Sequence, residues 1–290
     1  MSSDASVLFD APGPRTRRNQ RVVAGILLLV AVAIGVWVLM QLGAKGQLEA
    51  AKWRPLLWTD VWSEYLLPGI LGTLRAAAIS IAAASVIGLL LGVGRLSGMA
   101  PVRWLCGAVV EVFRAIPVLV MMLGSYALYV NRGMFPGYES LAGVVTGLTL
   151  YNGSVIAELV RSGVNNLPKG QAEAGLSIGL RPGQVMRSVQ LPQALTAMLP
   201  SLVSQLVVVL KDTALGYVIL YEELLRKADQ IGSWQGNVVP ALIFVAVLYI
   251  AMNYALTTLA GLIERRMRRR GHTAALPATP SAAEGQPAAP

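Results

Sequence analysis

Six long apolar runs, separated by short polar segments, dominate the pattern of hydrophobic and polar positions along the chain. They cover approximately residues 22–40, 66–94, 109–130, 141–160, 191–220 and 238–262. Each run is close to or longer than the roughly 20 apolar residues that an α-helix needs to cross the hydrocarbon core of a bilayer. The pattern therefore predicts an all-α integral membrane protein with about six transmembrane helices.

The composition agrees with a membrane protein and argues against a nucleic-acid-binding one. The chain is 55% hydrophobic and 13% charged, with a mean hydropathy of +0.59, whereas about 25% of the residues in soluble domains are charged. The net charge of +9 comes from Arg and Lys at the ends of apolar runs and near the termini. No basic patch with interleaved aromatic residues occurs. We therefore expect the lipid bilayer, and no nucleic acid, as a partner.

The polar segments divide the chain into five expected regions. Residues 1–21 form a basic arm, which we expect to be disordered. Residues 22–42 form an extra transmembrane helix; the alternative is a signal peptide, but this run is longer than the usual apolar core of one. Residues 43–65 contain three tryptophans, which favour the headgroup level, and are expected outside the cell. A core follows over residues 66–264, and residues 265–290 form a basic and then Ala/Pro-rich disordered tail.

Arginine clusters near both termini set the expected orientation. The positive-inside rule places these clusters, and therefore both ends of the chain, in the cytoplasm. An even number of spans agrees with this placement. The same topology puts the polar loop over residues 168–193 in the cytoplasm.

This loop begins with a pattern typical of a short amphipathic helix with a small-residue face. Ala172, Gly175, Leu176 and Gly179 follow the helical period of 3.6 residues. Glu173 lies beside that face near the expected helix start, where the helix dipole favours a negative charge. The run Arg-Pro-Gly at residues 181–183 is expected to break the helix. Such a face can dock against another surface; an ordinary connecting loop is the alternative.

Ionisable residues in or beside the spans are further candidates for function, because charges in a membrane are costly unless they are paired or functional. Glu111 with Arg114, and Glu158 with Arg161, are spaced i,i+3 on helices. Such pairs can neutralise each other on neighbouring turns. The alternative is that they line a polar substrate path.

Lys211, Asp212 and Thr213 interrupt the apolar run over residues 191–220. Broken helices at membrane depth are how transporters build polar sites, so these residues are candidates for a substrate path. The alternative is a charge pair at the end of a helix. Arg75, inside the second run, is a further path candidate or an interfacial anchor.

The residue inventory argues against an enzyme. The only cysteine is Cys106, and the only histidine, His272, follows a cluster of arginines near the C-terminus. We expect no catalytic residues and no metal site. The phosphate-binding motif Gly-x-x-x-x-Gly-Lys-Ser/Thr is absent, so the chain is not expected to hydrolyse ATP.

The polar loop resembles the EAA loop of the membrane subunits of bacterial ATP-binding-cassette (ABC) importers. That motif has Glu-Ala-Ala, a Gly four residues after the last Ala, and then a hydrophobic-x-Leu-Pro end. Gly replaces the last Ala here. The resemblance implies that this helix couples the chain to an ATPase subunit, through Glu173, Ala174, Gly175, Gly179, Leu191 and Pro192.

Other segments resemble the polar-amino-acid branch of these importers. They are residues 69–74, 111–117, 155–163, 168–174 and 210–215. Ala115, Val155 and Ala214 depart from the branch pattern, which has Gly, an aromatic residue and Ser at these positions. Residues 211–225 are similar to the second permease subunit of actinobacterial glutamate importers, which makes glutamate the first expected cargo.

The resemblance implies a complete machine around this chain. Its expected partners are an ABC ATPase subunit, a second permease subunit that is a different chain, and an extracytoplasmic amino-acid-binding protein. The chain itself would hold no cofactor, and ATP with Mg would be used by the ATPase. The expected location is the plasma membrane of a bacterium, and the expected path residues are Arg75, Arg114, Glu158, Arg161, Lys211, Asp212 and Thr213.

Three other functions compete with this interpretation. An ion-coupled secondary amino acid transporter would have inverted repeats and acidic residues at mid-membrane, but no convincing repeat occurs and only Asp212 lies at a plausible depth. A membrane enzyme would need catalytic groups. A structural scaffold would tolerate loss of the charges at Lys211 and Asp212.

Overall fold

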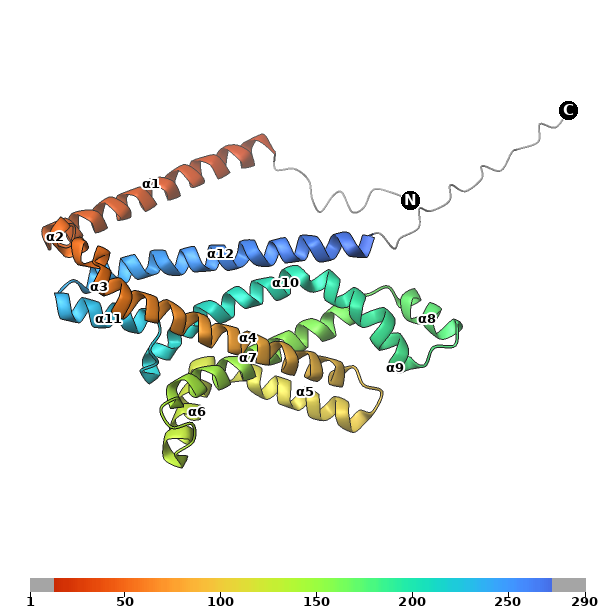
Figure 1. Cartoon of the computed structure of the whole chain (residues 1–290). Coiled ribbons are helices and arrows are strands. Elements are labelled where there is room, and N and C mark those ends of the chain that lie inside the picture. The colour runs from red at the N-terminus through yellow and green to blue at the C-terminus, as the bar shows by residue number, and fades with distance from the viewer. Residues whose placement is uncertain (1–12, 273–290) are drawn as a thin grey trace.

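The computed structural model describes residues 13–272, and for residues 14 and 263–272 only the backbone. This part of the chain is helical and has no strand, which confirms the all-α fold class. The helices, labelled in Figure 1, are α1 (Pro14–Ala44), α2 (Ala50–Trp53), α3 (Thr59–Val61), α4 (Leu67–Arg95), α5 (Ala100–Ala115), α6 (Val118–Arg132), α7 (Glu139–Asn165), α8 (Lys169–Ser177), α9 (Pro182–Val185), α10 (Leu191–Asp212), α11 (Leu224–Gln235) and α12 (Val238–His272).

Within residues 13–272, five helical stretches are long and apolar enough to cross a membrane, or six if the bent pair α5 and α6 counts as one span. The expected span over residues 109–130 is therefore not one straight helix. Its axis turns by 99° between Ala115 and Val118. The cause is Pro117, which has no backbone N–H and disfavours helical backbone at the preceding Ile116, where φ is −87° and ψ is 128°.

Helices α4 and α7 pack side by side in the centre of the molecule (Figure 1). Glycines on α4 allow this close approach. A Cβ atom at Gly88 would lie 2.6 Å from the Cβ atom of Ile156, and Gly92 meets Val160 in the same way. Helices α5, α6 and α10 pack against this pair, and α12 packs on α10 and α11.

The segment expected to lie outside the cell at the headgroup level, over residues 43–65, is largely helical. It forms α2, a 3₁₀ turn (Arg54–Leu57), α3 and a π-helical turn (Trp62–Leu66) that continues into α4. Trp53 and Trp62 pack against a buried cluster shared with α11 and α12, while Trp58 is half exposed. The expected core boundary at residue 66 thus lies inside a continuous helical stretch, Thr59–Arg95.

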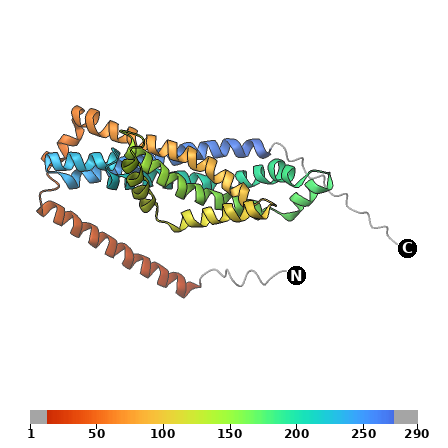
Figure 2. The ribbon, with the colours of Figure 1, turned by 90° about the horizontal axis from the view of Figure 1, so that it is seen from below.

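Helix α1 stands apart from the bundle in both views (Figures 1 and 2), and none of its apolar window is buried. It begins at Pro14, so part of the arm expected over residues 1–21 is helical; proline is favoured in the first turn of a helix. Likewise α12 extends to His272, through the start of the tail expected over residues 265–290. The rest of both segments lies outside the described residues.

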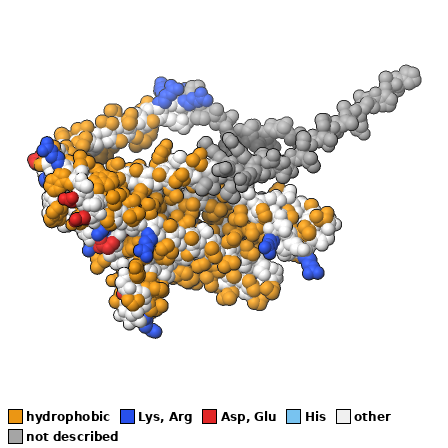
Figure 3. Space-filling view, viewed as in Figure 1, with side chains coloured by type: hydrophobic (Ala, Val, Ile, Leu, Met, Phe, Trp, Pro, Cys, Tyr) orange, Lys and Arg blue, Asp and Glu red, His pale blue; other side chains and the backbone are white. Residues whose placement is uncertain are grey.

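Hydrophobic side chains cover most of the face seen in Figure 3. Lys and Arg gather at the start of α1, at the left of the view and around α8 and α9. The end of α12 and α8 lie toward the same end of the molecule, whereas the start of α1 lies about midway along the bundle (Figures 1 and 2). This arrangement suits a protein with an apolar middle in the bilayer and charged ends in water.

Candidate functional site

Helix α8 projects at one end of the molecule and ends in a left-handed glycine (Figure 1). Gly179 has a φ of +85°, a conformation that glycine adopts without strain. The N–H of Leu180 donates to Gly175 O at 3.2 Å, and the N–H of Gly179 donates to Leu176 O at 3.0 Å. This Schellman pair ends the helix before Arg181. The expected break at residues 181–183 is therefore misplaced, because Pro182 begins α9.

The small face of α8 is only partly turned toward the protein, through Ala172 and Gly175, whereas Leu176 and Gly179 are exposed. Gly175 is buried, and a Cβ atom there would lie 2.9 Å from Val185 Cγ2 on α9. Ala172 is half-buried. The surface that α8 leaves free instead carries Glu173, Ala174, Leu176 and Ile178, of which Leu176 is 49% and Ile178 78% exposed.

A widened helical turn joins this region to the membrane part. Residues Met186–Gln190 form a π-helical turn directly before Leu191 and Pro192, the first residues of α10. The N–H of Leu191 donates to Met186 O, five residues back. A wide turn of this kind accommodates the proline ring, which would otherwise meet the carbonyl four residues earlier. Leu191 and Pro192 thus shape the entry to α10.

Three arginines surround Glu158 where α4, α5 and α7 meet. Arg95 Nη1 donates to Glu158 Oε2 at 2.7 Å, Arg161 Nε donates to the same oxygen at 3.2 Å, and Arg114 lies 3.9 Å from it. The expected pair of Glu158 and Arg161 is therefore present. Glu111 does not pair with Arg114 as expected, because it accepts from Arg95 at 3.1 Å instead.

Arg75 lies far from this network. Arg75 and Arg95 are both on α4, so about 30 Å separates them along the helix axis. The guanidinium of Arg75 lies 5.4 Å from the ring centre of Tyr138, in the segment that joins α6 to α7. The two residues line a hollow of about 410 Å³ with Phe135 and Thr146. The structure thus does not gather all expected path residues into one site.

The helix breaks where Lys211, Asp212 and Thr213 interrupt the apolar run. Helix α10 ends at Asp212, and a 3₁₀ segment continues over Thr213–Ile219. Thr213 is buried and its hydroxyl donates to Leu210 O at 2.7 Å. Lys211 is exposed and Asp212 is half-buried, and among the described side chains neither forms an ion pair. The alternative, a charge pair between these residues at the end of a helix, is therefore not formed among the described side chains.

A polar contact between α7 and α10 lies among apolar residues and was missed in the sequence. Gln205 Nε2 donates to Asn152 Oδ1 at 2.6 Å, and the amide of the fully buried Asn152 also donates to Leu148 O. Ionisable residues alone do not identify this contact, because both side chains are uncharged. Two amide side chains inside long apolar runs would have indicated a polar site in the membrane.

The buried carboxylate of Glu223, also missed, organises the end of the bundle opposite α8. It accepts from the N–H groups of Leu225 and Arg226, each at 2.7 Å, and from the hydroxyl of Tyr249 at 2.6 Å. Burial raises the pKa of Glu223 above its ordinary value, which these hydrogen bonds oppose. Burial also raises the pKa of the neighbouring Tyr221 to about 12.

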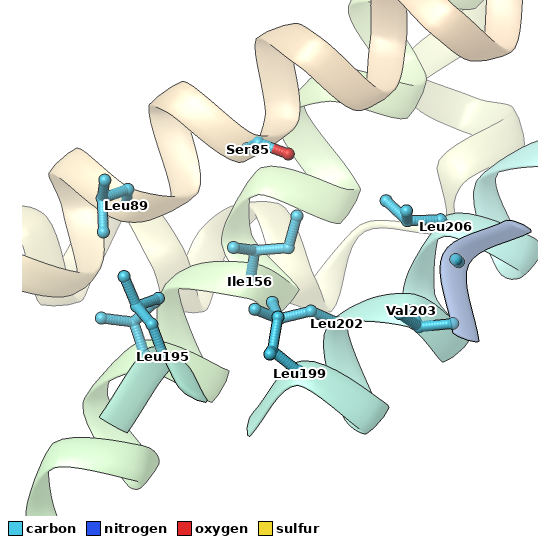
Figure 4. A pocket seen from close by; sticks show the side chains of 10 residues that line it. Ser85, Leu89, Ile156, Leu195, Leu199, Leu202, Val203 and Leu206 are labelled. Carbon is cyan, nitrogen blue, oxygen red and sulfur yellow. The ribbon is translucent and has the colours of Figure 1, made fainter. Parts of the chain in front are cut away.

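An apolar groove of about 320 Å³ lies between α4, α7, α10 and α12 (Figure 4). Nine apolar side chains and Ser85 line it, among them Leu89, Ile156, Leu199 and Leu206. An amino acid carries two charges and needs polar partners when it leaves water. This groove on its own therefore does not suit an amino acid.

Comparison with known proteins assigns the family. The model of a family described as "Binding-protein-dependent transport system inner membrane component" matches residues 84–269. The chain belongs to this family. It is 47% identical to the glutamate transport system permease protein GluD of Corynebacterium glutamicum over 228 residues, 78% of this chain and 84% of the relative. It is 31% identical to the glutamate/aspartate import permease protein GltK of Escherichia coli, over 70% of this chain and 93% of the relative.

A solved structure agrees with this assignment. A chain of an amino acid ABC transporter, crystallised with histidines, has a TM-score of 0.64 and 29% identity to this protein. The match covers 71% of this chain and 95% of that chain. The expected resemblance to ABC importer permeases is thus confirmed. So is the expectation that the chain is not an enzyme, because its relatives are transport permeases.

Membership of this family indicates the membrane and the kind of complex in which the chain is found. The protein is an inner-membrane component of an ABC importer. The family implies an ATPase, a binding protein and a second permease subunit as partners.

Proposed function

We propose that this chain is one of two different permease subunits of an ATP-driven importer of polar amino acids, with glutamate as cargo. The similarity to the permeases of two glutamate importers carries the cargo assignment. The chain forms one side of the translocation path, and the ATPase subunits use ATP with Mg. Both termini face the cytoplasm, as the arginines at the start of α1 and along residues 265–270 suggest.

We further propose that α8 is the helix that docks on the ATPase. Its projection from one end of the molecule and its exposed Glu173, Leu176 and Ile178 support this role. Gly175 and Gly179 contribute to the shape of this region: Gly175 lets α9 approach, and Gly179 ends the helix. Small residues at these positions therefore determine the orientation of α8 and the length of its exposed surface.

The path itself is proposed to pass the polar groups that α7 and α10 carry in the membrane. These are the amides of Asn152 and Gln205, with Lys211 and Asp212 beyond them on α10. Arg114, Glu158 and Arg161 lie toward α8 and hold helices together, whereas Arg75 lies toward the outer end. The binding protein would approach that outer end, which α2, α3 and α11 cover.

Two substitutions in α8 test the docking assignment. Glu173→Lys reverses a charge on the exposed face, and Gly179→Leu puts a side chain where φ is +85°. In the reconstituted importer, each should lower uptake by at least about tenfold, equivalent to one lost interface contact of about 1.4 kcal/mol. The matched control is Gly183→Ala, since a Cβ atom there has no neighbour within 4 Å.

Uptake should be measured beside basal ATP hydrolysis and the amount of inserted chain. Loss of uptake with normal insertion supports the docking role of α8. Normal uptake in both variants would exclude it, and it would leave the assignment of the chain to a glutamate importer intact.

A further inference from the structure

A charged groove of about 480 Å³ lies beside α5, where α4 ends and α7 approaches its own end. Arg95, Arg103, Glu111 and Arg161 line it, together with Trp104, Gly107 and Ala108. Helix α4 ends at Arg95, where a stretch that is long and apolar enough to cross a membrane also ends. Arginine and tryptophan side chains at the end of such a stretch favour the headgroup level of the bilayer, so the groove suits that level.

The groove keeps positive charge after its internal ion pairs are formed. Of the side chains that the structure describes, two carboxylates (Glu111 and Glu158) and four cations (Arg95, Arg103, Arg114 and Arg161) are in reach, which leaves two positive charges. Among the described side chains, no carboxylate pairs with Arg103. Its one guanidinium hydrogen bond goes to the carbonyl of Ser97 at 3.1 Å, so most of its N–H donors are free for a ligand.

An apolar stripe runs along the same helix next to this groove. Trp104 is 76%, Leu105 68% and Val112 54% exposed. An indole at the end of a span favours the headgroup level of the bilayer. Because the charged groove and the apolar stripe are adjacent on α5, one ligand that carries an anionic head and apolar chains can occupy both.

We propose that this groove binds the phosphodiester headgroup of an anionic phospholipid. Arg103 donates hydrogen bonds to the phosphate, Arg95 and Arg161 add positive charge, and the acyl chains lie along Trp104 and Leu105. The carboxylate of Glu111 also faces the groove and is held by Arg95. The apolar stripe favours a lipid over a free phosphate ion, because a phosphate ion has no apolar chain to contact the exposed indole and leucine.

The test uses the assembled importer in nanodiscs that contain brominated phosphatidylglycerol or brominated phosphatidylcholine at equal mole fraction. Bromine quenches nearby tryptophan, and the contribution of Trp104 is the difference between the natural chain and Trp104→Phe. We expect the site to hold phosphatidylglycerol about fivefold more often than phosphatidylcholine. This ratio corresponds to the attraction of one basic residue for an anionic lipid at a membrane surface. Arg103→Gln should bring this preference to about one, whereas Arg132→Gln, an exposed arginine at the end of α6, should leave it unchanged.

Four results would overturn the proposal. Equal quenching by the two lipids, or an unchanged preference in Arg103→Gln, would mean that the groove does not recognise an anionic headgroup. Loss of the preference with inorganic phosphate, but not with chloride at the same ionic strength, would assign the groove to free phosphate. Absence of quenching by either lipid would mean that a protein partner covers the stripe.

Discussion

Glu158 connects three helices through a single carboxylate. Arg95, Arg114 and Arg161 reach it from α4, α5 and α7, and only 22% of its side chain is exposed. Three guanidinium groups held around one carboxylate lose their common partner when it is removed, and they then repel one another. The stability of this end of the bundle should therefore depend strongly on Glu158.

Replacement of Glu158 by Gln should lower the free energy of unfolding by about 3 kcal/mol, the cost of breaking a largely buried pair. Glu111→Gln is the matched control, because Glu111 is 63% exposed and contacts Arg95 alone. Its effect should stay within about 1 kcal/mol. Thermal unfolding of the purified protein in one detergent compares the two, and equal losses would contradict the central place of Glu158.

Glu223 should give the protein a stability that depends on pH. Burial raises its pKa above the ordinary value of 4.5. A raised pKa favours the protonated carboxyl in the folded state, so its contribution is complete below pH 4.5 and is lost as the pH rises through the folded-state pKa. Tyr221, Glu222 and Tyr249 are the titratable neighbours of this group.

The midpoint of thermal unfolding should therefore fall as the pH is raised from about 4.5 toward 8, and Glu223→Gln should flatten that slope. Glu222→Gln, at a neighbouring and more exposed position, should keep it. A slope that is the same in the natural chain and in Glu223→Gln would show that other groups produce the pH dependence.

At these single positions, the sequence correctly predicted the local pair of Glu158 and Arg161, wrongly predicted that of Glu111 and Arg114, and missed contacts between distant positions. The spacing of Glu158 and Arg161 indicated their contact, because residues three apart on a helix are neighbours. Arg95 and Glu158 are 63 positions apart, and no periodicity connects them. The contact of Asn152 with Gln205 likewise joins distant positions and depends on how α7 and α10 pack, although the two uncharged amides were visible inside the apolar runs.

Helices α4 and α7 depend on glycine for their closest contact. A Cβ atom at Gly88 would lie 2.6 Å from Ile156 Cβ and 2.7 Å from the carbonyl oxygen of Gly153. Backbone cannot move away as a flexible side chain can, so even a methyl group would force the helices apart. Close packing over small residues is common between membrane helices.

Gly88→Ala should destabilise the protein by about 1–3 kcal/mol through overpacking, which lowers the unfolding midpoint by several degrees. Gly124→Ala on α6 is the control, because a Cβ atom there has no neighbour within 4 Å and alanine favours a helix. The measurement is thermal unfolding of both variants side by side. Similar midpoints would contradict the close contact between α4 and α7.

The elements themselves were largely predictable, whereas their bends were not all placed correctly. Apolar runs located α1, α4, α7, α10 and α12, since a long apolar helix has few alternatives in a bilayer. Pro117 lies inside the run over residues 109–130, and the sequence does not say whether such a proline kinks a helix or divides it. The structure divides it, at an angle of 99°.

The whole molecule has an apolar middle, charged ends and one helix that the bundle does not enclose. The motif in residues 168–193 indicated the family without any structure, and the comparisons confirm that family. The side of α8 that faces outward was not predictable, because it depends on how α9 folds back against Gly175. The role of α1 likewise depends on partners that a single chain does not contain.

Uptake of radiolabelled glutamate into proteoliposomes tests the central claim most directly. The chain would be reconstituted with its ATPase, second permease and binding protein, and compared with the chain alone. We predict uptake that requires ATP and the binding protein, and that persists when ionophores dissipate ion gradients. Uptake by the chain alone, driven by an ion gradient without ATP, would contradict the account and identify a secondary transporter.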